Sequence, residues 1–144
     1  MVKSLPKNVQ DLFNDREAVK VLATHSDSTM HVVPLGMMAP MPDMIAYGRG
    51  FLNIETHENL LNAKKNGGLA SVLAVKGRIA YQVRVKPMEY QTSGPLFDKI
   101  KEIWKPLAEQ MKMNINDLLI GIWTLQPIEI INQGMEEGGM GKKL

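Results

Sequence analysis

The sequence contains no cysteine among its 144 residues, which excludes disulfide bonds, thiol catalysis and thiolate metal sites. An excess of one charge is also missing, because 17 Lys and Arg residues are balanced by 15 Asp and Glu residues. This balance gives no argument for nucleic acid or a membrane surface as a partner. No apolar run approaches the roughly 20 residues of a membrane-spanning helix, and the first residues lack the apolar region of a signal peptide. We therefore expect a cytoplasmic protein.

Common catalytic and metal-binding motifs are absent as well. The sequence has no G-x-S-x-G, Walker A, H-E-x-x-H or G-x-G-x-x-G pattern, and GRGF at residues 48–51 matches only a fragment of the last. The three histidines, His25, His31 and His57, have no partners at ligand spacing. We therefore expect no metal site, and the sequence identifies no catalytic side chain.

The apolar content of 44% is that of an ordinary globular domain with a buried core. We expect one domain over residues 1–133, followed by a flexible, Gly-rich C-terminal tail over residues 134–144. Methionine is frequent, and GMMAPMPDM holds four of the eleven. Two interpretations stay open for this segment: a loop folded over the core, or an adaptable wall for a flat ligand or a partner subunit.

The pattern of apolar residues predicts six strands and three helices. The strands are expected at 18–24, 30–35, 43–48, 69–75, 78–86 and 118–131, and the helices at 6–14, at 56–66 and from 95 onward. Strands that follow one another through short turns favour an antiparallel sheet. We therefore expect a mainly β, α+β fold, a six-stranded antiparallel split β-barrel, because barrel closure removes exposed sheet edges. Pro34 is expected at an edge or bulge, Pro127 at a bulge or bend, and Pro106 at a helix kink or break.

The segment 43–66 is the main candidate for a binding site. It reads as a strand, a loop with Gly48 and Gly50, and a helix that begins with Thr56 as its N-cap. Unpaired N–H groups at such a helix start attract a phosphate, and Arg49 on the loop is placed to add a charge-assisted contact. The alternative is a capped helix without a ligand and an Arg49 side chain in solvent.

The order of elements, the segment ATHSDSTMHVVPL and the T-x-x-N-L motif at Thr56–Leu60 resemble the pyridoxamine 5′-phosphate oxidase-like family of FMN-binding split barrels. The resemblance covers about Leu12 to Phe97, and SGPLFDKI at residues 93–100 is similar to the small FMN-binding proteins and flavin reductases of that family. It implies a homodimer with one FMN in each of two grooves at the subunit interface. It also implies hydride or electron transfer with a small-molecule or protein redox partner.

The resemblance also implies which residues contact the flavin. The ring is expected against the end of the second strand, and the phosphate near the loop and helix start that follow the third strand. Asn59 falls on the recurring asparagine of the family, Gln82 on a strand position that reaches the flavin, and Trp104 on an aromatic near the ring. The full set is Val33, Pro34, Leu35, Gly36, Gly48, Arg49, Glu55, Thr56, Asn59, Gln82 and Trp104.

Glu55 departs from the family pattern, because members often carry Lys or Arg just before the threonine. A carboxylate facing a phosphate repels it, more strongly where water is excluded. Either Glu55 points away and Arg49 or His57 compensates, or the site has lost FMN or binds something else. The alternatives are therefore a non-enzymatic split-barrel dimer with a binding or structural role, or a relative that uses another flavin-like or haem-type ligand. Whether the chain is an FMN-dependent oxidoreductase stays open at this point.

Overall fold

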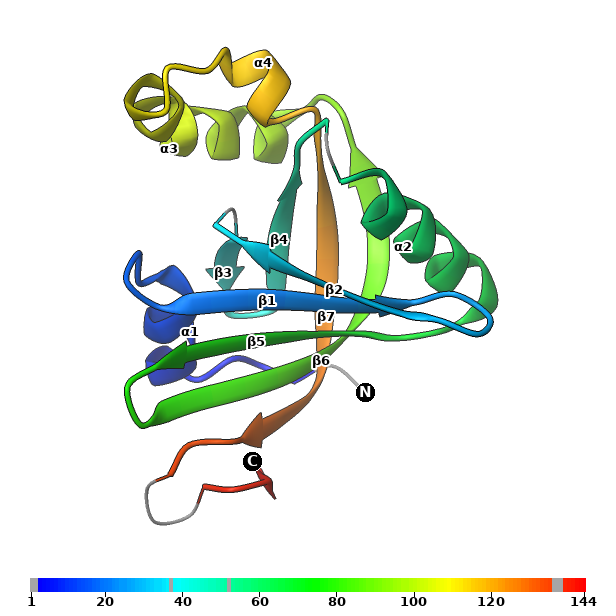
Figure 1. Ribbon diagram of the computed structural model, residues 1–144, viewed down its shortest axis with the longest axis vertical. Helices are drawn as coiled ribbons and strands as arrows, with labels where there is room; N and C mark the ends of the chain where they lie inside the picture. The colour runs from blue at the N-terminus through cyan, green and yellow to red at the C-terminus, as the bar shows by residue number, and fades with distance from the viewer. Residues whose placement is uncertain (1–2, 37, 52, 136–138) are drawn as a thin grey trace.

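The computed structural model describes residues 3–36, 38–51, 53–135 and 139–144, and Figure 1 shows their arrangement. The strands form one curled sheet, and the helices lie around it. The strands are β1 (Val19–His25), β2 (Met30–Leu35), β3 (Met38–Met41), β4 (Met44–Arg49), β5 (Ala70–Lys76), β6 (Ile79–Gln91), β7 (Gly121–Asn132) and β8 (Lys142–Lys143). The helices are α1 (Lys7–Asn14), α2 (Ile54–Asn66), α3 (Pro95–Gln110) and α4 (Ile115–Leu118).

Every strand pair in the sheet is antiparallel, as expected for strands joined by short turns. The order is β2-β1-β5-β6-β7-β4-β3, and β8 pairs with β7 outside this path. The predicted α+β class is confirmed, but the described residues hold eight strands, so the predicted number of six is wrong. The two additional strands are short, and each is held by its pairing with a longer neighbour, which no local pattern reveals.

The strand β3 lies in the methionine-rich segment and pairs with β4 through the tight turn at Pro42 and Asp43. Met38 of this strand is buried in the core. Of the two interpretations given for the segment, neither described it as a strand, because Pro40 lowers the strand tendency of so short a run. Met37 lies outside the described residues.

The sheet curls because its two longest strands are bent by bulges. Pairing of β6 with β7 shifts register twice, which leaves Ile128 of β7 and Met88 of β6 as extra residues. The bulge predicted at Pro127 is thereby confirmed. In Figure 1, β4 and β7 run upright while β1, β2 and β5 cross them, so the sheet forms a half-open barrel.

Other proline predictions have mixed outcomes. Pro34 lies in β2, an edge strand of the path, as its missing N–H requires. Pro106 does not break α3, which continues from Pro95 to Gln110. The last long strand starts later than predicted, because Ile115–Leu118 form α4, where the Asn114 side chain accepts a 2.9 Å hydrogen bond from the Asn116 backbone N–H.

Two apolar clusters hold these elements together. The first fills the inside of the curl, where Phe13 of α1, Leu22 of β1 and Trp123 of β7 pack together. The second lies on the other side of β4 and β7, where Ile100 and Trp104 of α3 pack against Ala46 of β4. The sheet is thus covered by α1 within the barrel and by α3 outside it.

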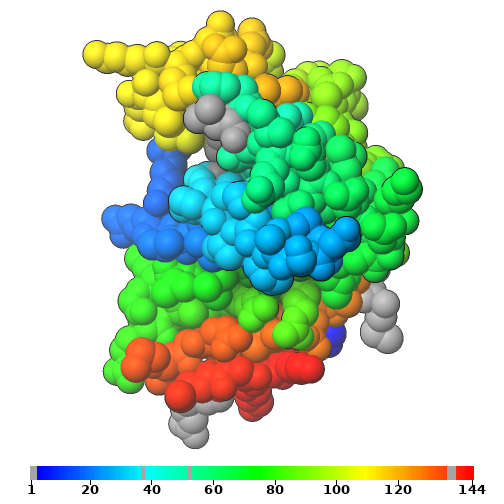
Figure 2. Space-filling view, turned by 45° about the vertical axis from the view of Figure 1, so that its right-hand side comes forward, coloured from blue at the N-terminus to red at the C-terminus, as the bar shows by residue number. Residues whose placement is uncertain are grey.

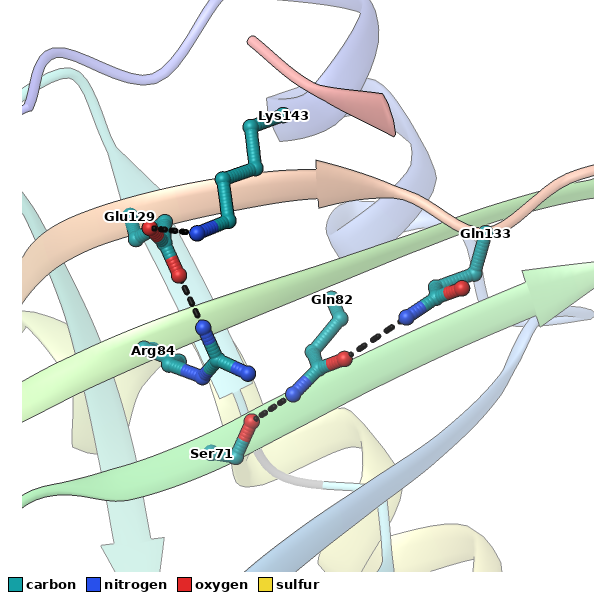
Figure 3. A network of polar contacts seen from close by, with 6 residues as sticks. All are labelled: Ser71, Gln82, Arg84, Glu129, Gln133 and Lys143. Atoms are coloured by element: carbon teal, nitrogen blue, oxygen red, sulfur yellow. Dashed lines mark hydrogen bonds and ion pairs between the residues drawn. The ribbon is translucent and has the colours of Figure 1, made fainter. Parts of the chain in front are cut away.

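The C-terminal residues 139–144, predicted to be flexible, contain β8 and are hydrogen-bonded to β7. The Gly141 N–H donates to the Asn132 carbonyl at 2.7 Å, and the Leu144 N–H donates to the Ile130 carbonyl at 2.9 Å. Figure 3 shows Lys143 and Arg84 both paired with Glu129, with Lys143 Nζ 3.1 Å from its carboxylate. The contacts from Lys143 first, and then Arg84, lower the pKa of Glu129. The division of the chain at residue 134 stays a prediction.

Candidate functional site

A cavity of about 230 Å³, which we call the loop cavity, lies where β2 and β4 end. It brings together Pro34, Leu35 and Gly36, which the resemblance assigns to a flavin ring, and Gly48, which it assigns to the phosphate end. The loop before α2 and the connection between α3 and α4 also line the loop cavity. The remaining lining residues are Gly50, Phe51, Asn53, Met111, Met113, Asp117 and Leu118.

The walls of the loop cavity are mostly apolar, with few polar groups. Asn53 is fixed by a 2.8 Å hydrogen bond from its Nδ2 to the Tyr47 hydroxyl, and burial raises the pKa of Tyr47 to about 12. Gly50 is required by a close approach, because an added Cβ would lie 3.0 Å from the Leu118 carbonyl oxygen. An apolar cavity with a few fixed polar groups suits a flat, largely apolar ring.

Arg49 is the last residue of β4 and lies between the cavity residues Gly48 and Gly50. Its Nη1 donates to the Tyr90 hydroxyl at 3.0 Å, and its guanidinium carbon lies 5.8 Å from the Tyr90 ring centre. Its Nε is buried and has no hydrogen-bond partner in the part of the chain that the structure describes. Arg49 itself does not line the loop cavity, although both of its neighbours in the chain do. A buried N–H donor without a partner is a group that an anionic oxygen would satisfy.

Thr56 does not cap α2, so the cap prediction is wrong. The helix begins at Ile54 with Asn53 in the N-cap position, and Thr56 is its third residue, only 1% exposed. Its hydroxyl oxygen has no partner among the described residues, and Thr56 does not line the loop cavity. The earlier helix start turns this side chain inward. Its role in phosphate binding therefore stays a prediction.

Glu55, the departure from the family pattern, contacts the Nδ1 atom of His31 in β2 through its carboxylate. The Glu55 side chain is 64% exposed, so solvent screens its charge. Of the alternatives above, this contact fits a Glu55 that points away from the loop cavity, which it does not line.

Several residues that the resemblance assigns to the flavin lie outside the loop cavity. Val33 packs against the first core cluster, and Trp104 is buried in the second. Asn59 is buried and donates to the Thr24 hydroxyl at 3.1 Å, which ties α2 to β1. Their assignment to FMN stays a prediction, and the structure gives Asn59 and Trp104 a packing role.

Gln82 lies in a different place, on the outer face of the sheet. Figure 3 shows it between Ser71 and Gln133: its Nε2 donates to the Ser71 hydroxyl at 2.7 Å, and its Oε1 accepts from Gln133 at 2.9 Å. All three line a second cavity of about 520 Å³, the sheet-face cavity, with Val21 and Leu73 on its floor. Within one chain, Gln82 is therefore separated from the loop cavity.

An aromatic cluster packs beside Arg49 and links it to the core. The rings of His57 and Tyr90 have centres 4.4 Å apart, and Trp123 Nε1 donates to His57 Nδ1 at 3.0 Å. Burial, then the nearby Arg49 charge, lowers the pKa of His57, and Glu58 opposes this shift. Since Nδ1 accepts from Trp123, neutral His57 carries its proton on Nε2.

This lowered pKa predicts a loss of stability in mild acid. The unfolded chain takes up a proton at His57 near pH 6.5, at higher pH than the folded protein, so the stability is complete above that pH and falls below it. We expect the urea midpoint to fall between pH 7.5 and pH 5.0, and to fall less in His57→Gln. The exposed His25→Gln serves as the control. An equal decrease in the wild type and His57→Gln would contradict this role for His57.

Several residues around the site have no sequence signal. Met111 and Met113 reach the loop cavity from the end of α3, far along the chain from Pro34. Tyr90 lies near the end of β6, beyond the predicted limits of that strand at residues 78–86. These contacts arise from the curl of the sheet, and only the GMMAPMPDM segment had suggested a methionine-rich wall.

Comparison with known proteins bears on the fold. No family model matches the sequence, and no curated protein does. Several solved structures are similar to this chain. HupZ of Group A Streptococcus has a TM-score of 0.71 at 16% identity, over 97% of this chain and 98% of that chain. An FMN-binding protein from Syntrophomonas wolfei has a TM-score of 0.71 at 17% identity, over 89% and 85% of the two chains. A protein from Lactobacillus delbrueckii, described as a pyridoxamine 5′-phosphate oxidase of unproven assignment, has a TM-score of 0.63 at 19% identity, over 91% and 99%.

The chain has the split-barrel fold of these proteins. The expected resemblance is thereby confirmed at the level of the fold. The sequence identities are below 20%, so the similarity concerns the fold alone. No helix in the described residues has the length and apolar character needed to span a membrane.

Proposed function

We propose that this chain is a flavoprotein that binds FMN noncovalently, with the ring at the loop cavity and the phosphate at Arg49. The observation that carries the proposal is the meeting of Pro34–Gly36 with Gly48 in one cavity, together with the buried Nε of Arg49, which follows Gly48 in the chain and has no hydrogen-bond partner among the described residues. The similarity in fold to an FMN-binding protein supports the choice of ligand. The apolar walls would exclude water from the ring, and Arg49 would hold the phosphate through charge-assisted hydrogen bonds.

The size of the loop cavity favours a site shared by two chains. Its volume of about 230 Å³ is below the roughly 300–1,000 Å³ of sites that enclose a ligand of this kind. One chain therefore covers part of the flavin, and a second copy would complete the enclosure. We accordingly include a homodimer, with FMN at the interface, in the proposal.

The outer face of the sheet offers a surface for that second copy. Val19 and Val32 are 63% and 60% exposed, and they lie next to the apolar floor of the sheet-face cavity. In Figure 2, the blue-to-cyan β1–β2 hairpin lies at the surface between the yellow α3–α4 region and the red C-terminal segment. Exposed apolar surface of this kind is typical of contacts between subunits.

The flavin, when bound, supplies hydride or electron transfer, and the chain supplies its position and electrostatics. We therefore propose an FMN-dependent oxidoreductase with a small-molecule or protein redox partner. Similar folds include a protein named F420 reductase and an FAD-binding protein from Mesorhizobium loti. A comparison of FMN with FAD and F420 belongs in the test, because it decides which flavin the loop cavity accepts.

Sedimentation of the purified protein with FMN tests the ligand and the dimer together. We expect the flavin absorbance to move with a species of about twice the 16.1 kDa chain mass, at tens of micromolar flavin. Serum albumin at equal concentration controls for nonspecific flavin binding. Flavin absorbance that does not sediment with the protein would contradict FMN binding, and a flavin-bound species of single-chain mass would contradict the shared site.

A further inference from the structure

We infer that Tyr90, His57 and Trp123 form a positioning chain that fixes the Arg49 guanidinium for an anion, and that proton uptake by His57 opens this chain. The inference rests on the proposed function only for the identity of the anion as the FMN phosphate. The contacts themselves belong to the protein without ligand. From the sequence, His57 was considered only as a residue that compensates Glu55 beside a phosphate, and Tyr90 and Trp123 were not assigned to the flavin site.

The first step is the contact between Tyr90 and Arg49. The Tyr90 hydroxyl accepts from Arg49 Nη1 at 3.0 Å, while the ring lies under the guanidinium carbon at 5.8 Å. Gly121, which pairs with Arg49 across β4 and β7, makes room for this ring. An added Cβ at Gly121 would lie 2.5 Å from Tyr90 Cζ, so even alanine would displace the tyrosine. The backbone is thus shaped to let Tyr90 reach Arg49.

The second step connects Tyr90 to the rigid core. His57 packs against Tyr90 with ring planes inclined at 56°, and Trp123 lies 5.4 Å from Tyr90 between ring centres. Trp123 is fully buried, and its indole N–H donates to His57 Nδ1 at 3.0 Å. Tyr90 and His57 are only half-buried, so their own burial holds them less firmly than that of a core residue. Their contacts with the buried Trp123 restrain the two rings. A guanidinium held in this way loses less conformational freedom when it binds an anion.

The third step is the proton. Nδ1 of His57 accepts the Trp123 hydrogen bond only while the imidazole is neutral, since both nitrogens of an imidazolium are donors. The charged groups that face His57 are Arg49, whose guanidinium repels an imidazolium, and Glu58, which attracts one, with the neutral Tyr90 hydroxyl nearby. Protonation therefore breaks the contact with Trp123 and adds a positive charge beside Arg49. The positioning chain is closed at neutral pH and opens in acid.

NMR of the ligand-free protein tests the chain independently of flavin. We expect the Trp123 indole N–H resonance to shift with a midpoint below pH 6.5 in the wild type and to stay constant in His57→Gln; Trp104→Phe assigns the two indole signals. We also expect the Arg49 Nε–H to exchange with water several-fold faster in Tyr90→Phe than in the wild type. An indole resonance that does not titrate, or an unchanged exchange rate, would overturn the inference.

Binding measurements test the consequence for an anion. In Tyr90→Phe we expect FMN affinity to fall about fivefold, the effect of one lost hydrogen bond, while riboflavin, which lacks the phosphate, binds as before. Tyr81→Phe, which removes a hydroxyl bonded to Asn8 elsewhere on the sheet, is the matched control. Equal losses for FMN and riboflavin would overturn the positioning role. If the wild type binds no flavin, the proposed function fails, and the NMR measurements alone decide the positioning chain.

Discussion

Replacement of Arg49 with methionine is expected to weaken FMN binding by about 10- to 100-fold and to leave riboflavin binding unchanged. Charge-assisted hydrogen bonds to a phosphate contribute about 1.5–3 kcal/mol, and every 1.4 kcal/mol is a factor of ten in affinity. The buried Nε of Arg49 has no partner among the described residues, so the phosphate is the group that would satisfy it. Quenching of flavin fluorescence on titration with the protein measures both affinities.

Two further variants make the Arg49 result specific. Arg16→Met removes an arginine from an exposed turn and controls for the loss of net positive charge. Arg49→Lys keeps the charge and loses the planar fork, so its FMN affinity should lie between those of the wild type and Arg49→Met. A similar loss for FMN and riboflavin in Arg49→Met would show that the residue supports the fold of the site instead of the phosphate.

Replacement of Trp123 with alanine is expected to lower the free energy of unfolding by about 3–5 kcal/mol, the typical cost of removing a buried tryptophan. Trp123 is fully buried in the first core cluster, and its loss would leave a cavity and remove the hydrogen bond to His57. This cost is a large share of the total stability of about 5–15 kcal/mol for a domain. Urea denaturation followed by circular dichroism measures it.

Trp123→Phe accompanies this experiment, because the alanine variant is at risk of not folding. Phenylalanine keeps most of the packing and loses the indole N–H, so we expect a cost of about 1 kcal/mol or slightly more. Equal stability of the wild type and Trp123→Phe, together with a loss below about 1 kcal/mol in Trp123→Ala, would contradict the central place of this residue in the core.

The two cavities both support the proposed dimer. The loop cavity is too small to enclose a flavin alone, and the sheet-face cavity lies on an uncovered apolar surface of the same chain. Gln82, which the resemblance assigns to the flavin, lies at the second of these. A structure of the protein with FMN bound would show whether Gln82 reaches a flavin, and that assignment stays a prediction until then.

Much of the secondary structure follows from local rules, and sequence patterns find it. The strand Met30–Leu35 has the predicted limits, because β-branched residues between a turn and a glycine favour an extended chain. Pro34 lies at an edge and Pro127 at a bulge because neither can donate to a neighbouring strand. The N-terminal helix was found from Pro6 and its apolar face of Val9, Leu12 and Phe13.

The candidate site was only partly predictable. The segments that end at Gly36 and Gly48 were expected to meet at the flavin, and they line one cavity. The N-cap of α2 was predicted at Thr56 but lies three residues earlier, at Asn53, because asparagine is an equally good N-cap residue. The contact of Glu55 with His31 joins α2 to β2, two elements that lie too far apart in the chain for a local pattern to connect them.

The sequence by itself determined the strand and helix pattern, the antiparallel class and the segment that carries Arg49, because these depend on neighbours within a few residues. Only the tertiary structure decided the strands β3 and β8, the burial of Thr56 and the contact of Tyr90 and His57 with Arg49. The physical reason is that these features depend on pairs of residues brought together by the curl of the sheet. Such contacts cannot be predicted from the spacing of residues along the chain.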